Sequence, residues 1–299
     1  MKTLNLIILS VAIFFVFIGI SSAQTEIDST DLYELETIDG NSYLGNIIKE
    51  EINIVQFNTG NLGIISFPRS NIKKLNKITK ERIIMGKLWF ENPQSTRYFW
   101  APNGYGLKKG EGYYQNIWVL WNQSSVGITD YFSVGIGVIP LFLFGSGVAE
   151  YTPLFVVPKL SFPVIRDKFN LGAGILAGTI GFKNDAGFGI AYGVSTFGSK
   201  NNNFTIGVGY GYADGDWSTH PLINISGMIR LSSKTYFLTE NYFFGMDGEW
   251  VGFLSAGARS MIRKVGLDYG LFIPISSEID QIIALPWLGI SIPLNLNSK

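Results

Sequence analysis

His220 is the residue with the clearest catalytic chemistry, because it is the only histidine in a chain of 299 residues. Ser218 and Asn224 lie close to it in sequence, so this stretch contains the residue types of a serine–histidine–asparagine site. A serine and a histidine often occur together in loops, however, and closeness in sequence does not supply the geometry that a catalytic site needs. We therefore assign no catalytic residue and expect no enzymatic activity.

Motifs for metals and phosphates are also weak. The chain has no cysteine and no cluster of histidines. Asp214 and Asp216 resemble a fragment of a calcium loop, but the later ligands of such a loop are missing. The glycines of residues 207–211 alternate as in a strand and precede no helix, so they do not form a phosphate loop. We predict no metal site and no cofactor.

Charged residues inside strand-like segments are the remaining candidates for a functional site. An Arg or Lys that faces lipid at the middle of a membrane costs about 2–4 kcal/mol, so these side chains are expected to point inward and to pair. They would then form either the selectivity lining of a pore or a neutralising network in a plugged lumen. The candidate lumen charges are Lys159, Arg230, Glu240, Arg259 and Asp268, and Arg97 is a further charge within such a segment.

Strict alternation of side-chain types defines the two faces of these segments. The alternation of residues 132–138 recurs in six further segments towards the C-terminus, and five of those match a period of two without exception. The rival architecture, a soluble β-sandwich, would need a hydrophilic face on each sheet, and glycine would leave its core underfilled. In the first segment Phe132, Val134, Ile136 and Val138 should therefore face lipid, and Ser133, Gly135 and Gly137 should face inward.

The sequence predicts an all-β protein in which residues 95–299 form an antiparallel transmembrane β-barrel of about 12 strands. The composition supports this prediction, with 15% charged residues, 14% aromatic residues and 35 glycines. The strands are expected to begin near residues 95, 111, 131, 151, 168, 186, 202, 218, 235, 249, 264 and 281. If the small N-terminal domain lies in the periplasm, an even strand number places both termini on the periplasmic side, and most of the tight turns fall there as well. An aromatic girdle is expected at the outer strand ends, from Tyr98, Trp100, Trp217 and Trp250.

The residues before the barrel divide into four segments. Residues 1–23 have the apolar run and small residues of a cleaved signal peptide, and residues 24–30 form a polar linker. Residues 31–76 contain short strand patterns and hairpin turns, which predicts a small periplasmic β-domain, and residues 77–94 form a connector. The Asp39-Gly40 turn and the pattern Gly-x-Ile-x-Phe-Pro that ends at Pro68 resemble SH3-like or Sm-like β-domains. Acidic and basic residues balance at 23 each, so no nucleic-acid partner is expected.

A second resemblance covers roughly residues 30–299. The stretch Asn92-Pro-x-Ser-Thr-Arg-Tyr98 and its continuation from Gly106 to Gln115 are similar to a family of uncharacterised outer-membrane β-barrels of Gram-negative bacteria. This resemblance implies a place in the outer membrane, but it brings no catalytic residues and no substrate.

The leading functional prediction is a narrow pore or a small-solute-binding barrel in the cell outer membrane, surrounded by outer-membrane lipid. One alternative is a structural or assembly anchor whose residues 31–76 dock an envelope protein. A third possibility, a lipid-modifying barrel enzyme, depends on His220 alone.

Overall fold

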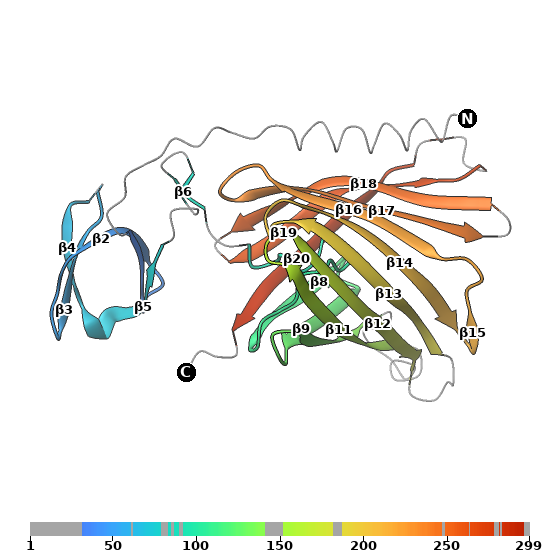
Figure 1. Cartoon of the computed structure of the whole chain (residues 1–299), viewed down its shortest axis with the longest axis horizontal. Coiled ribbons are helices and arrows are strands. Elements are labelled where there is room, and N and C mark those ends of the chain that lie inside the picture. The colour runs from blue at the N-terminus through green and yellow to red at the C-terminus, as the bar shows by residue number, and fades with distance from the viewer. Residues whose placement is uncertain are drawn as a thin grey trace. The chain divides into compact units, whose positions relative to one another are not determined.

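The computed structural model describes residues 32–60, 62–78, 83–84, 87–89, 92–140, 152–181, 187–246, 249–262, 264–277, 281 and 283–295. The chain divides into two compact units, one formed by residues 20–91 and one that contains residues 92–299. Regular structure within the described ranges of both units consists of β-strands and one short 3-10 turn (Figure 1). Within the described residues, no helix is long and apolar enough to cross a membrane. The predicted signal peptide, residues 1–23, and linker, residues 24–30, lie outside the described residues.

The smaller unit contains one sheet of five strands, arranged in the order β4-β3-β2-β1-β5. Its core is formed by Leu35, Phe57 and Phe67. At the predicted hairpin turn, Gly40 has a φ of 84°, and the Thr37 hydroxyl donates a hydrogen bond to the Asp39 carboxylate, which holds the pKa of Asp39 below its usual value. The elements are β1 (Tyr33–Thr37), β2 (Ser42–Glu50), β3 (Ile54–Asn58), β4 (Ile64–Pro68), the 3-10 turn η1 (Arg69–Asn71) and β5 (Ile72–Lys77), and the short pair β6 (Ile83–Ile84) and β7 (Lys87–Leu88) follows.

The larger unit is a closed antiparallel barrel of 12 strands, as the sequence predicted. Each strand pairs with its neighbour along the chain, and the last strand pairs back with the first, so the ring has no free edge. The short strand β15 (Asp216–Trp217) folds back on one barrel strand outside the ring. The ring consists of β8 (Glu111–Ile117), β9 (Trp121–Gly127), β10 (Phe132–Val138), β11 (Pro153–Ile165), β12 (Phe169–Ile180), β13 (Gly187–Gly198), β14 (Asn203–Ala213), β16 (Leu222–Arg230), β17 (Thr235–Met246), β18 (Glu249–Ile262), β19 (Val265–Ile275) and β20 (Leu285–Asn295).

The first two strands differ from the prediction, although the total is the same. The stretch near residue 95 is not a barrel strand, and residues 112–128, predicted as one strand, form β8, a turn and β9. Trp118 and Val119 make this turn with φ values of 50° and 67°, a conformation that usually requires Asn or Gly. Because one predicted strand is lost and one is gained, β10 remains the third strand and every later strand keeps its predicted direction.

The two faces of the barrel wall differ in exposure as the alternation predicted. On β10, Ile136 is 61% exposed, whereas Ser133 on the other face of the same strand is 8% exposed. Strand β13 is the exception, because its large side chains Tyr192 and Val194 point into the barrel. Tyr192 pairs in register with Gly174 of β12, which leaves the space that its ring occupies, and Val194 lies between Gly172 of β12 and Gly207 of β14 in the same way.

Replacement of Ile136 by Arg is expected to lower the free energy of unfolding in a lipid bilayer by about 2–4 kcal/mol, because it places a charge on the outward face. The matched control is Ile128→Arg at a turn between strands, where an exposed charge can reach water. The measurement is urea unfolding of both variants in lipid vesicles. Equal midpoints for the two variants would contradict the outward assignment of Ile136.

Candidate functional site

A hairpin formed by residues 92–109, which we call the lumen hairpin, lies inside the barrel. Its two limbs are joined by a hydrogen bond from Tyr98 N to Ala101 O (2.9 Å) and one from Asn103 N to Thr96 O (3.2 Å). Its side chains and backbone contact β11, β14, β17 and β19, which lie on different sides of the ring. The residues predicted as the first barrel strand therefore fill the lumen instead.

Both limbs of the lumen hairpin meet the same end of the barrel. We call this the turn end, because it carries the tight turns at residues 128–131, 166–168, 199–202 and 231–234. Asn92 Nδ2 donates to Lys200 O (3.3 Å), and the Tyr105 hydroxyl donates to Gly198 O (2.6 Å). Since the chain enters and leaves at the turn end, the tip around Trp100 points towards the opposite end, which we call the loop end.

An ion triad ties the lumen hairpin to the barrel wall. Arg259 donates to both carboxylate oxygens of Asp268, from Nε at 2.6 Å and from Nη2 at 2.8 Å, and Arg97 Nη1 donates to the same carboxylate at 3.1 Å. Arg259 also donates to the hairpin carbonyls of Gln94 (2.7 Å) and Tyr98 (2.6 Å). All three charged groups are buried, so the wall of β18 and β19 supplies both charge and hydrogen bonds to the hairpin.

Glu240 of β17 holds the tip of the lumen hairpin. Its Oε2 accepts hydrogen bonds from the backbone N–H groups of Trp100 and Ala101, each at 2.9 Å. Its Oε1 accepts a hydrogen bond from the Tyr242 hydroxyl at 2.7 Å. A hairpin tip leaves backbone donors without partners of its own, and this carboxylate satisfies two of them inside the barrel.

Lys159 of β11 contacts the opposite flank of the lumen hairpin. Its Nζ donates to Tyr105 O at 2.6 Å and to Thr96 O at 3.3 Å, so one ammonium bridges both limbs.

Arg230 differs from the other candidates, because its guanidinium donates to the turn carbonyls of Ser232 (3.1 Å) and Ser233 (2.8 Å) at the turn end. Of the five predicted lumen charges, four contact the lumen hairpin or its ion triad and one holds a turn.

Glycines let the return limb of the lumen hairpin approach the wall closely. A Cβ on Gly104 would lie 2.5 Å from the carbonyl oxygen of Asn170, and a Cβ on Gly106 would lie 2.8 Å from the Cβ of Ser161. Both wall residues are on the inward face of the barrel and are buried. At these two positions the close approach of the return limb to β11 and β12 therefore requires glycine.

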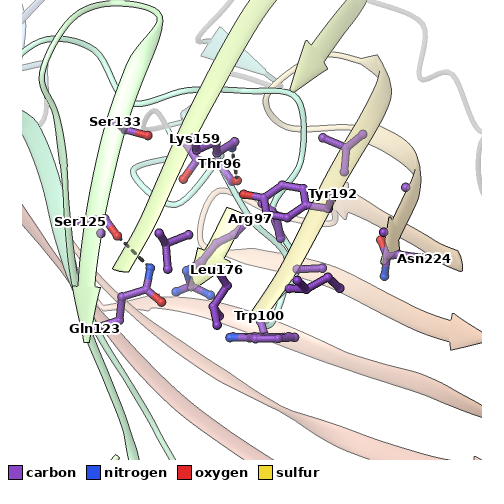
Figure 2. Close-up of a pocket in the computed structure, with 18 of the residues that line it drawn as sticks. Thr96, Arg97, Trp100, Gln123, Ser125, Ser133, Lys159, Leu176, Tyr192 and Asn224 are labelled. Carbon is purple, nitrogen blue, oxygen red and sulfur yellow. Dashed lines mark hydrogen bonds between the residues drawn. The ribbon is translucent and has the colours of Figure 1, made fainter. Parts of the chain in front are cut away.

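A cavity of about 100 Å³ lies beside the lumen hairpin (Figure 2). One water molecule needs roughly 10–15 Å³ of such volume, so the space suits several waters or one small solute. Apolar and aromatic side chains form much of its lining, including Trp100, Leu176, Ile190, Val194 and Tyr242. Polar groups on the lining are those of Thr96, Arg97, Gln123, Ser125, Ser133, Lys159, Tyr192 and Asn224.

Several buried donors at this cavity have no hydrogen-bond partner within the described part of the chain. They are Nε and Nη2 of Arg97 and the hydroxyl of Tyr192. The Arg97 guanidinium lies over the Tyr113 ring, 5.5 Å from its centroid, and uses only Nη1 for hydrogen bonds. An unpaired buried donor costs about 1–3 kcal/mol, so these groups favour a polar occupant of the cavity.

The residues predicted as an aromatic girdle separate into two pairs. Tyr98 and Trp100 belong to the lumen hairpin, and the Tyr98 hydroxyl contacts Asn203 and Thr205 at 2.6 Å each. Their assignment to a girdle is wrong, because residues 95–101 are not a wall strand. Trp217 and Trp250 lie at strand ends of the loop end and are 56% and 57% exposed.

The residues around His220 do not meet in one site. His220 is exposed, and its Nδ1 contacts Thr219 Oγ1 at 3.0 Å. The Ser218 hydroxyl donates instead to the backbone carbonyl of His220 at 3.0 Å, and Asn224 is buried inside the barrel. Over the part of the chain that is described, no group of three or more His, Cys, Asp or Glu residues could hold a metal ion.

Comparison with known proteins gives a structural similarity but no matching family. No protein-family model matches the chain, and no curated protein matches its sequence. Among solved structures, the outer-membrane expressed OmpT of Vibrio cholerae is similar at a TM-score of 0.31 and 14% sequence identity, with 88% of this chain and 94% of that chain covered. The fold assignment rests on the strand pairing of the chain itself, which closes an antiparallel barrel of 12 strands.

The prediction that the chain is not an enzyme is corrected. A closed β-barrel can carry an active site as well as a pore or an anchor, so the absence of enzymatic activity is no longer a conclusion.

Proposed function

We propose that the protein is an outer-membrane barrel that its own lumen hairpin keeps closed and that binds a small solute beside the hairpin tip. The observation that carries this proposal is the cavity between Trp100 and the inward faces of β9 to β16. A pore without a plug would leave its inward charges exposed to water. Here Glu240, Arg259 and Asp268 instead have protein partners and are buried.

The proposed orientation places the turn end in the periplasm. Tight turns at one end and longer connections at the other are the usual arrangement of bacterial outer-membrane barrels. The residues before β8 meet the turn end, which agrees with a periplasmic N-terminal unit that follows a cleaved signal peptide. The hairpin tip around Trp100 then points towards the cell exterior.

The smaller unit is proposed to be an SH3-like domain that docks an envelope protein. The second candidate function of the protein is therefore a structural or assembly anchor. The strand order β4-β3-β2-β1-β5 and the 3-10 turn between β4 and β5 support the SH3-like assignment. Docking is favoured by large apolar side chains that the sheet leaves exposed, namely Ile48, Ile52, Ile54, Leu62 and Ile64.

The solute-binding role is tested with benzyl alcohol, a neutral probe of the size that a small cavity accepts. The purified wild-type protein is expected to bind it saturably in isothermal titration calorimetry, because most of the lining is apolar. The variant Leu176→Trp, which fills the cavity from β12, is expected to lose this binding. Heat-dependent gel mobility checks that the variant is folded. Equal binding by both folded proteins would exclude the cavity as the site.

A further inference from the structure

We propose that the solute of this cavity carries one anionic group, a carboxylate or a phosphate, on a small apolar body. This inference rests on the proposed solute-binding function and adds the chemical class of the ligand. The anionic group would lie against Arg97 and Lys159, and the body would contact the apolar lining around Leu176 and Ile190.

The charge at the cavity is the first argument. Among the described residues that line it, Arg97 and Lys159 are charged and both are cations. Asp268 is the carboxylate that Arg97 contacts, but Arg259 binds both oxygens of that carboxylate at shorter distances. The two hydrogen bonds of Lys159 go to backbone carbonyls, which are neutral. The triad and the ammonium together therefore retain positive charge next to the cavity.

The carboxylate of Glu240 offsets only part of this charge. Arg97, Arg259 and Lys159 are three buried cations at the lumen hairpin, and Asp268 and Glu240 are the two buried carboxylates beside them. Buried cations are usually paired with an opposite charge. An anionic ligand would balance the positive charge that these five residues leave.

The unpaired donors of Arg97 and Tyr192 are the second argument. Arg97 is buried, and its Nε and Nη2 have no acceptor among the described residues. These two N–H groups are the side of a guanidinium that binds a carboxylate or phosphate through two parallel hydrogen bonds. The Tyr192 hydroxyl, which also has no described partner, provides a further donor on the cavity lining.

The rigid packing around Arg97 is the third argument. Its Nη1 is fixed by Tyr98 O and Phe99 O, each at 2.8 Å, and its guanidinium lies over the Tyr113 ring. The free N–H groups are therefore held in place before any ligand binds. Preorganised donors cost little additional entropy on binding, which favours a specific anion site over a mobile surface charge.

Three probes of similar shape and different charge test the inference: benzoate, benzyl alcohol and benzylamine. The wild-type protein is expected to bind benzoate roughly 10- to 100-fold more tightly than benzyl alcohol, and benzylamine least tightly. Phenyl phosphate is measured beside benzoate to separate a carboxylate site from a phosphate site. Benzyl alcohol binding without a preference for benzoate would overturn the anion inference but leave the proposed function standing. If no probe binds, both proposals fail.

Two variants identify the residues that supply the preference. Lys159→Met and Arg97→Met also remove hydrogen bonds of the lumen hairpin, so the readout is the ratio of the two affinities. Each variant is expected to reduce the preference for benzoate over benzyl alcohol about tenfold or more. Arg230→Met is the matched control, because Arg230 is a cation that is 8% exposed, as Lys159 is, but lies at the turn end. An equal loss of benzoate affinity in all three variants would indicate a nonspecific charge effect and would overturn the assignment.

Discussion

Deletion of the lumen hairpin is expected to convert a closed barrel into a conducting pore. Replacement of residues 94–107 by a short Gly-Ser linker removes the backbone that Lys159, Glu240 and Arg259 hold in the lumen. The 12 wall strands pair with one another without it, so the ring itself should persist. A 12-stranded barrel is wider than the eight-stranded barrels whose interior side chains fill. Planar-bilayer recordings should therefore show stable unitary currents for the deletion variant and none for the wild type.

The control for this experiment is a second deletion that leaves the lumen hairpin intact. Removal of residues 32–78 takes away the five-stranded sheet of the smaller unit, which forms a compact unit of its own. This variant should remain closed, because the contacts that hold the hairpin come from the barrel wall. A hairpin deletion that folds, as judged by heat-dependent gel mobility, and carries no current would refute the plug role of residues 92–109.

The barrel could be predicted from sequence because a lipid environment imposes a simple pattern. Outward positions must be apolar, so Ile136 and its neighbours reveal both the strand and its lipid face. The pattern shows that side chains alternate between two faces. It shows which face points inward only where the inward residues are small or polar. On β13 the large residues Tyr192 and Val194 are inward, and their orientation depends on glycines of the two adjacent strands.

The lumen hairpin could not be recognised from local sequence. Residues 95–101 contain three consecutive aromatic residues, which favour a strand, but residues 93–100 form turns and bends with a single bridge from Arg97 to Pro102. What places them inside is a set of distant contacts, such as Arg97 with Asp268 at a separation of 171 residues. Gly104 and Gly106 are a local signal that the backbone lies close to another segment of the chain. They do not identify that segment, which is the barrel wall at Asn170 and Ser161.

The inward orientation of the candidate charges was predictable from sequence, but their partners were not. The cost of a charge in lipid implies that Lys159, Glu240, Arg259 and Asp268 point inward. It does not imply their partners, because the hairpin backbone, rather than another wall strand, accepts or donates most of their hydrogen bonds. The turn role of Arg230 was likewise hidden, since its acceptors are carbonyls of the next turn.

Asp268→Asn is expected to lower the free energy of unfolding by roughly 3–5 kcal/mol, because it removes the one carboxylate that two buried guanidiniums share. The substitution keeps the size of the side chain, so the effect reports charge rather than packing. Urea unfolding in lipid vesicles, followed by tryptophan fluorescence, measures it. The comparison variant is Asp130→Asn, whose carboxylate accepts a hydrogen bond from Lys109 N at an exposed turn and should matter by less than about 1 kcal/mol.

A double-variant cycle then separates the ion pair from other effects of each substitution. Arg259→Met removes one of the two guanidiniums and the hydrogen bonds to Gln94 O and Tyr98 O. In Arg259→Met/Asp268→Asn only Arg97 is left without its carboxylate, so the double variant should be more stable than the sum of the single losses predicts, by about 1–3 kcal/mol. Additive losses would mean that the two residues act independently, and the triad would then not be what secures the lumen hairpin.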